Sequence, residues 1–540
     1  MSTPTHFLLT PLLRDPRQFA PATACEARDH EEGELLAELL RVVRRFCAAH
    51  VDGAAIDARG LLGAELLSEI GGLGWFGFTI PGEYGGAGLS VKAATRVVTE
   101  LAAANGSLGT CVGLHSGLAL YSLLHYGNAD LKQRYLPEVA AGERIASFAA
   151  TEPSAGSDLT GMRTTLSERD GKLWLNGSKC YVTNGGFCGI VTVVARSPGL
   201  GGARAGHTMV AVDPSWVGVH RQGEEKKLGL KGSSTLTFDF DEVEIPADHI
   251  IGQASQGMDH AHQALTWGRT FMAAGCLGSA QAALRAARVH TAERVQFGRP
   301  LAEFPLVRAQ TAAALADTYA SESVIRLVCD LDEVKQGDIG LDSAIAKIYG
   351  SESAWDVVDR CLQLMGGTGY IEGAGMARRL RDVRVTRIFE GANDVLRLHL
   401  ASAVLRWPSE ELEGLPALTP QVVPSLQPAA ARFDVVAGEL GATLLEIRKR
   451  LAFRLFQRQE VQVLMADAII AVYAMLAVLL RALGSVVEGE NEPARPVLAL
   501  SQVALQRLEA RARRALDLLR APEDPDHGRL VADVLRDSES

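Results

Sequence analysis

The chain has 540 residues, more than one hydrophobic core ordinarily supports, so we expect roughly two to four structural units. A hydrophobic fraction of 47% and a charged fraction of 22% are typical of folded globular proteins and argue against a disordered chain. Lys and Arg total 54 against 64 Asp and Glu. The resulting net charge of −10 argues against a general nucleic-acid binder, which needs a basic face.

The first region, 31–145, has the pattern of a helical domain. Its opening stretch, ELLAELLRVVRRFCAAH, repeats apolar residues at three- and four-residue spacing, namely Leu35, Leu39, Val42, Val43 and Phe46. Pro and Gly interrupt the pattern at 81–89, and helical spacing then resumes. The residues before this region lack the basic start and sustained apolar core of a secretory signal.

The region 146–252 changes to alternating apolar and polar residues, which predicts a small antiparallel β domain. In KLWLNGSKCYVT, 172–183, Asn176-Gly177 separates two alternating segments, and we expect a hairpin turn there. In TLTFDFDEVEIP, 235–246, alternation places three apolar side chains on one face: Leu236, Phe238 and Phe240.

Helical patterns return at 253–405, followed by an expected linker at 406–428 and a further helical domain at 429–540. The longest apolar run, AIIAVYAMLAVLL at 468–480, is shorter than the roughly 20 residues of a membrane span, so we expect a buried helix. The predicted fold is mainly α with a central antiparallel β domain. Eight scattered cysteines without zinc spacing predict reduced thiols and no metal site.

Two motifs in the β region carry polar groups and small residues that suit a bound ligand. TEPSAGSD, 151–158, offers hydroxyls and glycine that suit a carbonyl or phosphate ligand. YVTNGG, 181–186, places an aromatic ring beside a hydroxyl, which suits a planar ligand that also needs a hydrogen bond. An ordinary polar turn and a capped strand end explain the same residues, and the windows alone leave both explanations open.

Two further motifs lie in the second helical block. ERVQFGRP, 293–300, sets arginine and glutamine donors beside Phe297, which suits a pyrophosphate and its nucleotide. A cationic helix C-terminus with a Gly and Pro stop is the equal alternative. QLMGGTGY, 363–370, follows a helical run and lacks GxGxxG spacing, so it is not a Rossmann fingerprint.

The last motif, RIFEGAND at 387–394, raises the question of why Glu390 follows two apolar residues and precedes Gly391. A solvated glutamate at a turn before a helix is one answer. The other is a carboxylate in an apolar, ligand-covered site, where the neutral form is favoured and the raised pKa suits a base. Small residues in NGSLGTCVGLHSG, 105–117, pose a second open question, because they suit either a deep apolar cavity or tight helix packing.

Taken together and in this order, the motifs resemble the acyl-CoA dehydrogenase family over about residues 35–405. EKKLGLKGSST, GSESAWDVVDRCLQLMGG and RIFEGANDVLRL resemble most its very-long-chain acyl-CoA dehydrogenase branch, which carries an extra C-terminal helical domain. The resemblance implies a helical N-domain, a β middle domain and a helical bundle, followed by that extension. It also implies FAD as cofactor.

The activity implied by the resemblance is oxidation of the Cα–Cβ bond of a long-chain acyl-CoA to a trans-2-enoyl-CoA in fatty-acid β-oxidation. Glu390 would take the α-proton while a hydride passes to flavin N5, and Ser157, Arg269 and Gly391 would contact the substrate. Gly268 stands where some branches place their catalytic glutamate, which leaves Glu390 as the base. The implied FAD-binding residues are Phe148, Thr151, Ser157, Tyr181, Thr183, Arg294, Gln296, Phe297, Gln363, Gly366, Gly367, Asn393 and Asp394.

Among these residues, Arg294, Gln296, Gln363, Gly366 and Gly367 are implied to reach the FAD of the neighbouring subunit of a homodimer. This sequence departs from the family in two places that the motifs cover. Tyr181 stands where tryptophan is frequent, and Pro305 stands where glutamine is usual.

Partners and location follow from the same resemblance. An electron-transfer flavoprotein is the expected acceptor, and an acyl-CoA oxidase using O2 or a flavoprotein scaffold for complex assembly are the alternatives. We expect a cytoplasmic protein, peripheral to the inner face of the membrane through 440–460. There EIRKRLAFRLFQRQ mixes apolar and basic residues. A helix packed on its own domain with a solvated basic face explains that segment slightly better.

Overall fold

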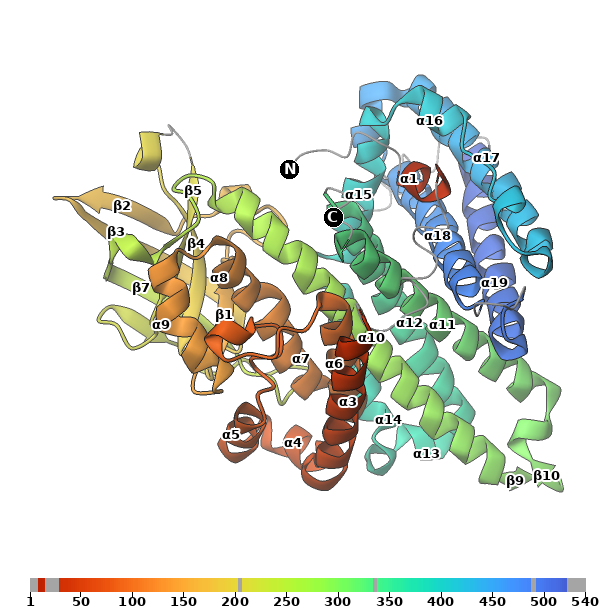
Figure 1. The fold of residues 1–540 in the computed structure, drawn as a ribbon, viewed down its shortest axis with the longest axis horizontal. Coiled ribbons are helices and arrows are strands. Elements are labelled where there is room, and N and C mark those ends of the chain that lie inside the picture. The colour runs from red at the N-terminus through yellow and green to blue at the C-terminus, as the bar shows by residue number, and fades with distance from the viewer. Residues whose placement is uncertain (1–7, 15–28, 203–205, 334–337, 487–491, 522–540) are drawn as a thin grey trace, which may run out of the picture.

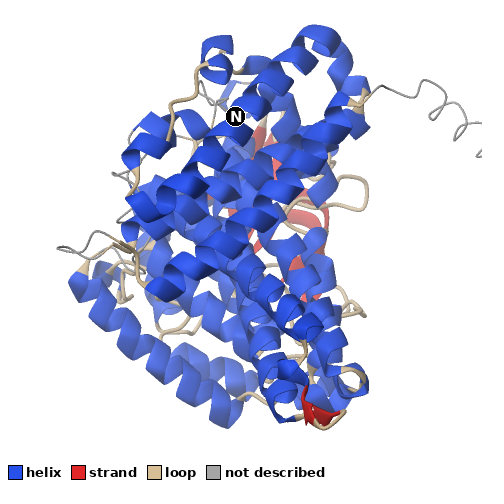
Figure 2. Ribbon diagram, turned by 90° about the vertical axis from the view of Figure 1, so that its right-hand side faces the viewer, coloured by secondary structure: helices blue, strands red, loops and turns tan. Residues whose placement is uncertain are grey.

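The computed structural model describes residues 8–14, 29–202, 206–333, 338–486 and 492–521. A β domain lies at one end of the molecule and helical blocks form the rest, with the long helix α10 running between them (Figure 1). Viewed from the side, the helical blocks cover most of the strands, and the short hairpin β9–β10 lies at their lower end (Figure 2). The fold is thus mainly helical around a central sheet, as predicted.

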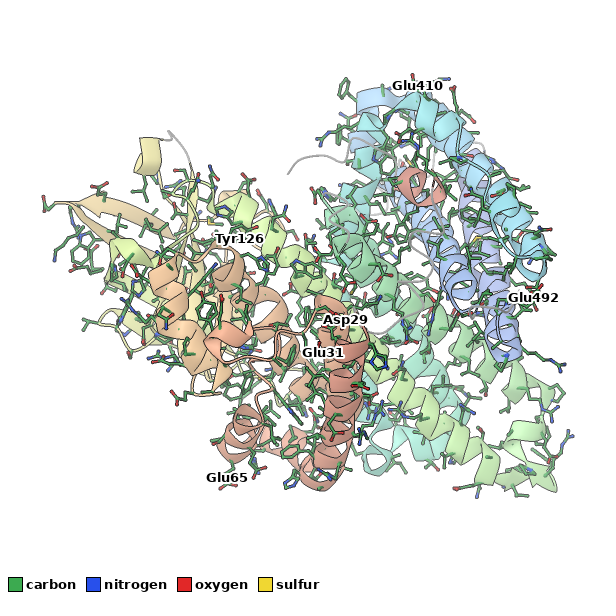
Figure 3. The ribbon with its side chains drawn as sticks, in the orientation of Figure 1. Asp29, Glu31, Glu65, Tyr126, Glu410 and Glu492 are labelled. Atoms are coloured by element: carbon green, nitrogen blue, oxygen red, sulfur yellow. The ribbon has the colours of Figure 1, made fainter. Side chains whose placement is uncertain are left out.

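The N-terminal helical block begins at α3, whose first turn is capped by the Asp29 side chain (Figure 3). Its buried stripe is Leu36, Leu40, Val43 and Cys47, while Leu35 is 47% exposed. Of the predicted stripe, Val43 is buried and Leu39 and Phe46 are partly buried, whereas Leu35 is not, because two adjacent helix faces share the same spacing and only the neighbouring helices select one. The helices are α3 His30–His50, α4 Gly53–Arg59, α5 Ala64–Gly72, α6 Val91–Ala104, α7 Gly106–Leu114, α8 Leu120–Tyr126 and α9 Ala129–Ala140.

The sheet has eight strands in the order β6-β7-β3-β2-β4-β5-β8, with β1 beside β4. Because β1 pairs with β4 in parallel, the sheet is mixed rather than purely antiparallel, which corrects the prediction. Leu236, Phe238 and Phe240 are buried on one face of β7, as the alternation predicted. The strands are β1 Ala146–Ala149, β2 Thr165–Arg169, β3 Lys172–Thr183, β4 Ile190–Arg196, β5 His207–Val212, β6 Val219–Arg221, β7 Thr235–Ile245 and β8 Ile250–Ile251.

The predicted hairpin at Asn176-Gly177 is wrong, since both residues lie inside the continuous strand β3. The turn is Asp170-Gly171, where both residues have positive φ and join β2 to β3 as a two-residue hairpin requires. Gly177 instead marks a register shift against β7. A Cβ there would lie 2.5 Å from Thr164 Oγ1, so glycine permits close backbone approach rather than a turn.

The second helical block is organised by α10, which leaves the β domain and ends at the hairpin β9–β10 (Figure 1). Its elements are α10 Gly257–Glu293, β9 Val295–Gln296, β10 Arg299–Pro300, α11 Pro305–Glu333, α12 Gly340–Met365, α13 Gly367–Tyr370, α14 Met376–Arg384 and α15 Asn393–Ala403. The following segment, predicted as a linker, is packed: it contains α16 Ser409–Glu413, and Leu412, Leu418 and Leu426 are buried.

The last helices, α17 Gln427–Leu451, α18 Gln459–Gly484 and α19 Arg495–Arg520, pack on the outside of this block, next to the N-terminal helix α1 Leu9–Arg14 (Figure 1). The run 468–480 is buried within α18, as predicted. Two stretches, Gly106–Tyr126 and α18, are long and apolar enough to span a membrane, and 83% of each apolar window is buried in the fold. Both therefore serve here as core helices.

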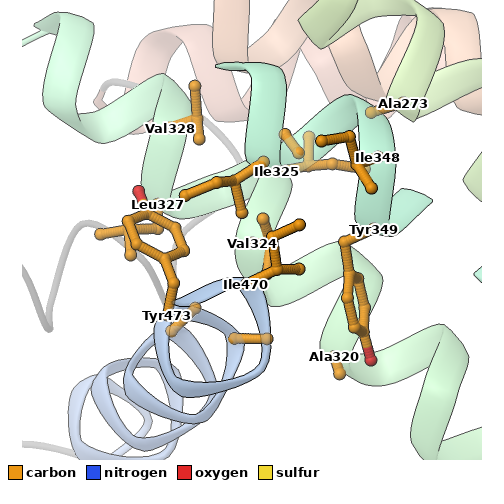
Figure 4. Packing of buried hydrophobic residues seen from close by; sticks show 14 of the residues in the cluster. Ala273, Ala320, Val324, Ile325, Leu327, Val328, Ile348, Tyr349, Ile470 and Tyr473 are labelled. Carbon is orange, nitrogen blue, oxygen red and sulfur yellow. The ribbon is translucent and has the colours of Figure 1, made fainter. Parts of the chain in front are cut away.

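Polar anchors fix the last helices to the bundle. Tyr473 and Ile470 of α18 face apolar side chains of α11 and α12 (Figure 4). The Tyr473 hydroxyl donates to the buried Asp342 at 2.8 Å, and the buried Asp317 of α11 accepts from Arg507 of α19 at 2.7 Å. The seven cysteines within the described residues are free and buried, while Cys25 lies outside them.

Candidate active site

Glu390 lies on the turn between α14 and α15, beside Gly268 and Arg269 of α10. Its backbone has φ +57°, and Gly391 follows with φ +91°. The carboxylate oxygen Oε2 is buried and has no hydrogen-bond partner among the described residues. A Cβ at Gly268 would lie 2.7 Å from Oε2, so the glycine leaves the room that this carboxylate occupies.

Burial raises the pKa of Glu390 to about 6, and the positive charges of Arg269 and Lys347 partly offset that rise. Arg269 is itself buried, and its Nε donates to the backbone carbonyl of Glu390 at 3.3 Å. Glu390 is therefore a desolvated carboxyl close to two cations, rather than the solvated glutamate of the alternative reading. Such a group can accept a proton near neutral pH.

Lys347 was missed by the sequence reasoning. It lies in the first half of α12, is fully buried, and donates to the carbonyl of Gly391 and to Asn393 Oδ1, each at 2.7 Å. Burial lowers its pKa to about 8. The available signal was a lone lysine within the otherwise apolar stretch AIAKIYG, since buried lysines need partners.

The rate of a reaction that uses Glu390 as a base should rise with pH through about 6, because only the carboxylate accepts a proton. Below that pH the rate should fall about tenfold per unit, as the ionised fraction falls. We expect this acid limb in kcat/KM measured between mildly acidic and mildly alkaline pH. An acid limb that remains at an ordinary glutamate pKa would contradict the buried, unpartnered carboxylate.

Phe148, Thr151, Tyr181 and Thr183, four of the predicted flavin residues of the β domain, lie at the ends of β1 and β3. The Cys180 amide donates to the Thr151 carbonyl, and Ser147 Oγ donates to the Thr183 carbonyl, so the two strand ends are side by side. Tyr181 lies on an irregular part of β3 with φ +56° and is 66% exposed. Phe148, Thr151 and Thr183 are partly exposed and Ser157 is exposed. This surface presents hydroxyls beside an aromatic ring.

The second predicted set lies elsewhere on the chain. Arg294, Gln296 and Phe297 are exposed on the hairpin β9–β10, at the end of the molecule opposite the β domain (Figure 1). Phe297 is 93% exposed and has φ +52°. Gln363, Gly366 and Gly367 are exposed where α12 ends. One copy of the chain therefore does not bring the hairpin to its own β-domain strand ends.

Asn393 and Asp394 differ from each other in exposure. Asp394 is exposed in the first turn of α15. Asn393 is buried, and its amide nitrogen donates to Ser351 Oγ at 3.0 Å and to Glu352 Oε1 at 2.9 Å, while its oxygen accepts from Lys347. The Asn393 side chain thus supports the Glu390 turn from inside the protein.

A narrow apolar cavity runs beside α10, starting about one helical turn beyond Gly268. Phe271, Met272, Gly275, Cys276 and Ser279 line it from α10, and Gly106, Gly109, Thr110, Gly113 and Leu114 face them from α7. From Gly268 to Ser279 the helix rises about 16 Å. The tight-packing reading holds at Gly109, where a Cβ would lie 2.6 Å from the backbone of Ala102, and Gly106, Gly109 and Gly113 also line this small cavity.

Three family models match the chain: acyl-CoA dehydrogenase N-terminal domain over 34–143, middle domain over 147–243 and C-terminal domain over 255–405. The mitochondrial very long-chain specific acyl-CoA dehydrogenase of Macaca fascicularis is 32% identical over 504 residues, which cover 86% of this chain and 76% of that protein. The human protein of the same name is 35% identical over 393 residues, covering 72% of this chain and 60% of its own length.

A solved structure extends the likeness to the C-terminal helices. An acyl-CoA dehydrogenase from Bacillus anthracis, crystallised in complex with FAD, superposes with a TM-score of 0.81 at 26% identity. The superposition covers 93% of this chain and 91% of that one. The helices beyond residue 405 are therefore part of an arrangement that this relative shares.

Proposed function

Because the chain belongs to the acyl-CoA dehydrogenase family, we propose that it oxidises a long-chain acyl-CoA to the trans-2-enoyl-CoA in fatty-acid β-oxidation. The enzyme is an FAD-dependent oxidoreductase. The observation that carries the proposed reaction is the buried carboxylate of Glu390, which faces Gly268 close to the apolar cavity.

The residues present fit a bound flavin. Thr151 and Thr183, partly exposed at the ends of β1 and β3, carry hydroxyls that can bond the polar edge of a planar ring, and the exposed ring of Tyr181 lies beside them. Thr151, Ser157, Tyr181 and Thr183 would hold this part of the cofactor. When bound, FAD supplies the acceptor for the two electrons removed from the substrate.

The chain's own residues perform the proton step. The Glu390 carboxylate removes the α-proton of the thioester, and its backbone N–H donates to the thioester carbonyl, where negative charge develops. Arg269 keeps the Glu390 carbonyl in place from α10. Closure of the buried site by the acyl chain excludes water and strengthens these interactions.

The test of the proposed function is anaerobic bleaching of the flavin band by butyryl-, octanoyl-, lauroyl- and palmitoyl-CoA. We expect palmitoyl-CoA to bleach the flavin fastest. Rapid aerobic turnover with release of peroxide would identify an oxidase instead. A protein that holds FAD but is bleached by none of these thioesters would support the scaffold alternative.

The placement of the two cofactor-binding sets supports a homodimer as part of the proposal. The hairpin carrying Arg294 and Gln296 lies opposite the β domain of its own chain, so a second copy is needed to bring it to a flavin (Figure 1). The α12 end, with Gln363, Gly366 and Gly367, is exposed and would join it. We propose an electron-transfer flavoprotein as the acceptor that reoxidises each subunit.

The segment 440–460 divides into a buried and an exposed part. Leu451 and Leu455 are buried in their own domain, as the packing alternative required, whereas Phe453 is 83% and Phe456 51% exposed. Both rings lie beyond the end of α17, next to the basic residues Arg450, Arg454 and Arg458. We therefore propose that the protein is cytoplasmic and that this corner binds it to the inner face of the membrane.

Replacing Phe453 and Phe456 together by serine should reduce binding to vesicles of mixed zwitterionic and anionic lipid by at least about 100-fold. The reason is that inserting each ring is worth about 1.5–3 kcal/mol. Vesicle flotation measures the bound fraction. The control is Val435→Ser, which removes another exposed apolar side chain from α17. Equal binding by the double variant and the control would exclude docking through this corner.

A further inference from the structure

Lys347 is a fully buried ammonium beneath the turn that carries Glu390. Its Nζ donates to the Gly391 carbonyl and to Asn393 Oδ1, each at 2.7 Å. The Asn393 amide is fixed in turn by Ser351 and Glu352 of the same helix, α12. A buried lysine is costly unless it is partnered, so this placement requires a compensating role.

The turn above Lys347 has an unfavourable backbone. Glu390 has φ +57°, a conformation that side chains with a Cβ rarely adopt, and Gly391 follows at +91°. Such a conformation persists where the surroundings over-determine it. Two cations from different helices do so here, because Arg269 Nε of α10 bonds the Glu390 carbonyl and Lys347 Nζ of α12 bonds the next carbonyl.

The charge of Lys347 also acts on the carboxylate. The charged groups that face Glu390 are Arg269 from α10 and Lys347 from α12, and both lower a pKa that burial raises. Lys347 is faced by Cys276 and Arg269 from α10 and by Glu352 from α12. Removing the ammonium leaves Arg269 as the remaining cation among these groups.

We propose that Lys347 is a positioning residue of the reaction. Its ammonium holds the Glu390–Gly391 turn so that the carboxylate meets the α-carbon, and its positive charge favours the ionised carboxylate. This inference rests on the proposed function, because it assigns a role to the base of that reaction. A purely structural lysine would affect folding and FAD content but not the titration of Glu390.

The experiment compares pH profiles of kcat/KM and kcat for full-length, FAD-loaded Lys347→Met, Lys347→Gln and Lys347→Arg. We expect Lys347→Met to lose about 30-fold in kcat at neutral pH and to move its acid limb up by about one pH unit. KM for palmitoyl-CoA should change by less than about threefold, since no substrate contact is removed. Lys347→Arg should restore the limb, because it keeps the charge.

Lys347→Gln separates charge from geometry. It keeps a donor for the Gly391 carbonyl, so it should fold and hold FAD even where the methionine variant does not, yet show the shifted acid limb. The matched control is Lys92→Met, which removes another buried lysine, paired with Asp330 at 2.5 Å. We expect the control to lower the melting temperature and leave the acid limb at its wild-type position.

A second readout is independent of turnover. The infrared band of the protonated Glu390 carboxyl, identified by its absence in Glu390→Gln, reports the same pKa in the resting enzyme. If no thioester bleaches the wild type, the proposed function fails, and the infrared titration still decides whether Lys347 acts on Glu390. If the wild type is active and Lys347→Gln matches it in both acid limb and infrared titration, this inference is overturned.

Discussion

Replacing Glu390 with glutamine should slow flavin reduction by palmitoyl-CoA by about 10²–10⁴-fold, the contribution typical of a positioned general base. The amide has nearly the same shape, so it should fit the space beside Gly268 and leave FAD content unchanged. It has no basic oxygen at accessible pH, so the α-proton stays on the substrate. Stopped-flow bleaching under anaerobic conditions measures the rate.

The control for this substitution is Asp342→Asn, which also converts a buried carboxyl with a pKa raised to about 6 into an amide. Asp342 bonds Tyr473, away from the proposed site, so we expect altered stability and near-normal bleaching. Bleaching by Glu390→Gln at more than about a tenth of the wild-type rate would remove Glu390 as the base. The base would then have to be sought among the other groups near α10.

Replacing Gly275 with leucine should change which thioesters the enzyme accepts. Gly275 lines the cavity from α10, and a Cβ there has only Ala102 Cβ nearby, at 4.0 Å. The Cβ of a leucine would therefore fit without meeting backbone, and the rest of its side chain would fill the cavity. We expect kcat/KM for palmitoyl-CoA to fall about 100-fold, because each displaced methylene loses roughly 1–3 kcal/mol of pocket contact. Butyryl-CoA, which ends before this point, should keep its rate within about threefold.

Gly438→Leu is the matched control, because it makes the same change on a helix where a Cβ meets nothing within 4 Å. It should leave the chain-length profile unchanged. An equal loss of rate for butyryl- and palmitoyl-CoA in Gly275→Leu would show that the leucine disturbs the Glu390 region instead. An unchanged profile would show that the acyl chain does not follow this cavity.

Local pattern was sufficient for several features. Alternation in 235–246 placed Leu236, Phe238 and Phe240 on the buried face, and the apolar run 468–480 predicted a buried helix. Those features depend on which side chains of a single helix or strand share one face, and the spacing of residues along that element already gives this information. The motif around Glu390 nominated that residue as a candidate base, because the chemistry of a base is tied to residue types at fixed spacing.

Features decided by contacts between distant segments could not be predicted. Asn176-Gly177 and Asp170-Gly171 carry the same turn signal, and only the pairing of β3 with β2 shows that Gly177 is needed for close approach to Thr164. In α3 the choice between Leu35 and Leu36 as the buried residue depends on the helices packed beside it. The two possible faces of α3 differ by one position along the helix, and both carry apolar residues, so the sequence does not show which face is buried.

The sequence by itself therefore determined the fold class, the family resemblance and Glu390 as the candidate base. The tertiary structure decided how that base is held, because Lys347 is separated from Gly391 by 44 residues and meets it only when α12 packs beneath the turn. It likewise decided that the hairpin with Arg294 lies opposite the β-domain strand ends of its own chain (Figure 1). A buried charge takes its effect from its surroundings, and those surroundings exist only after folding.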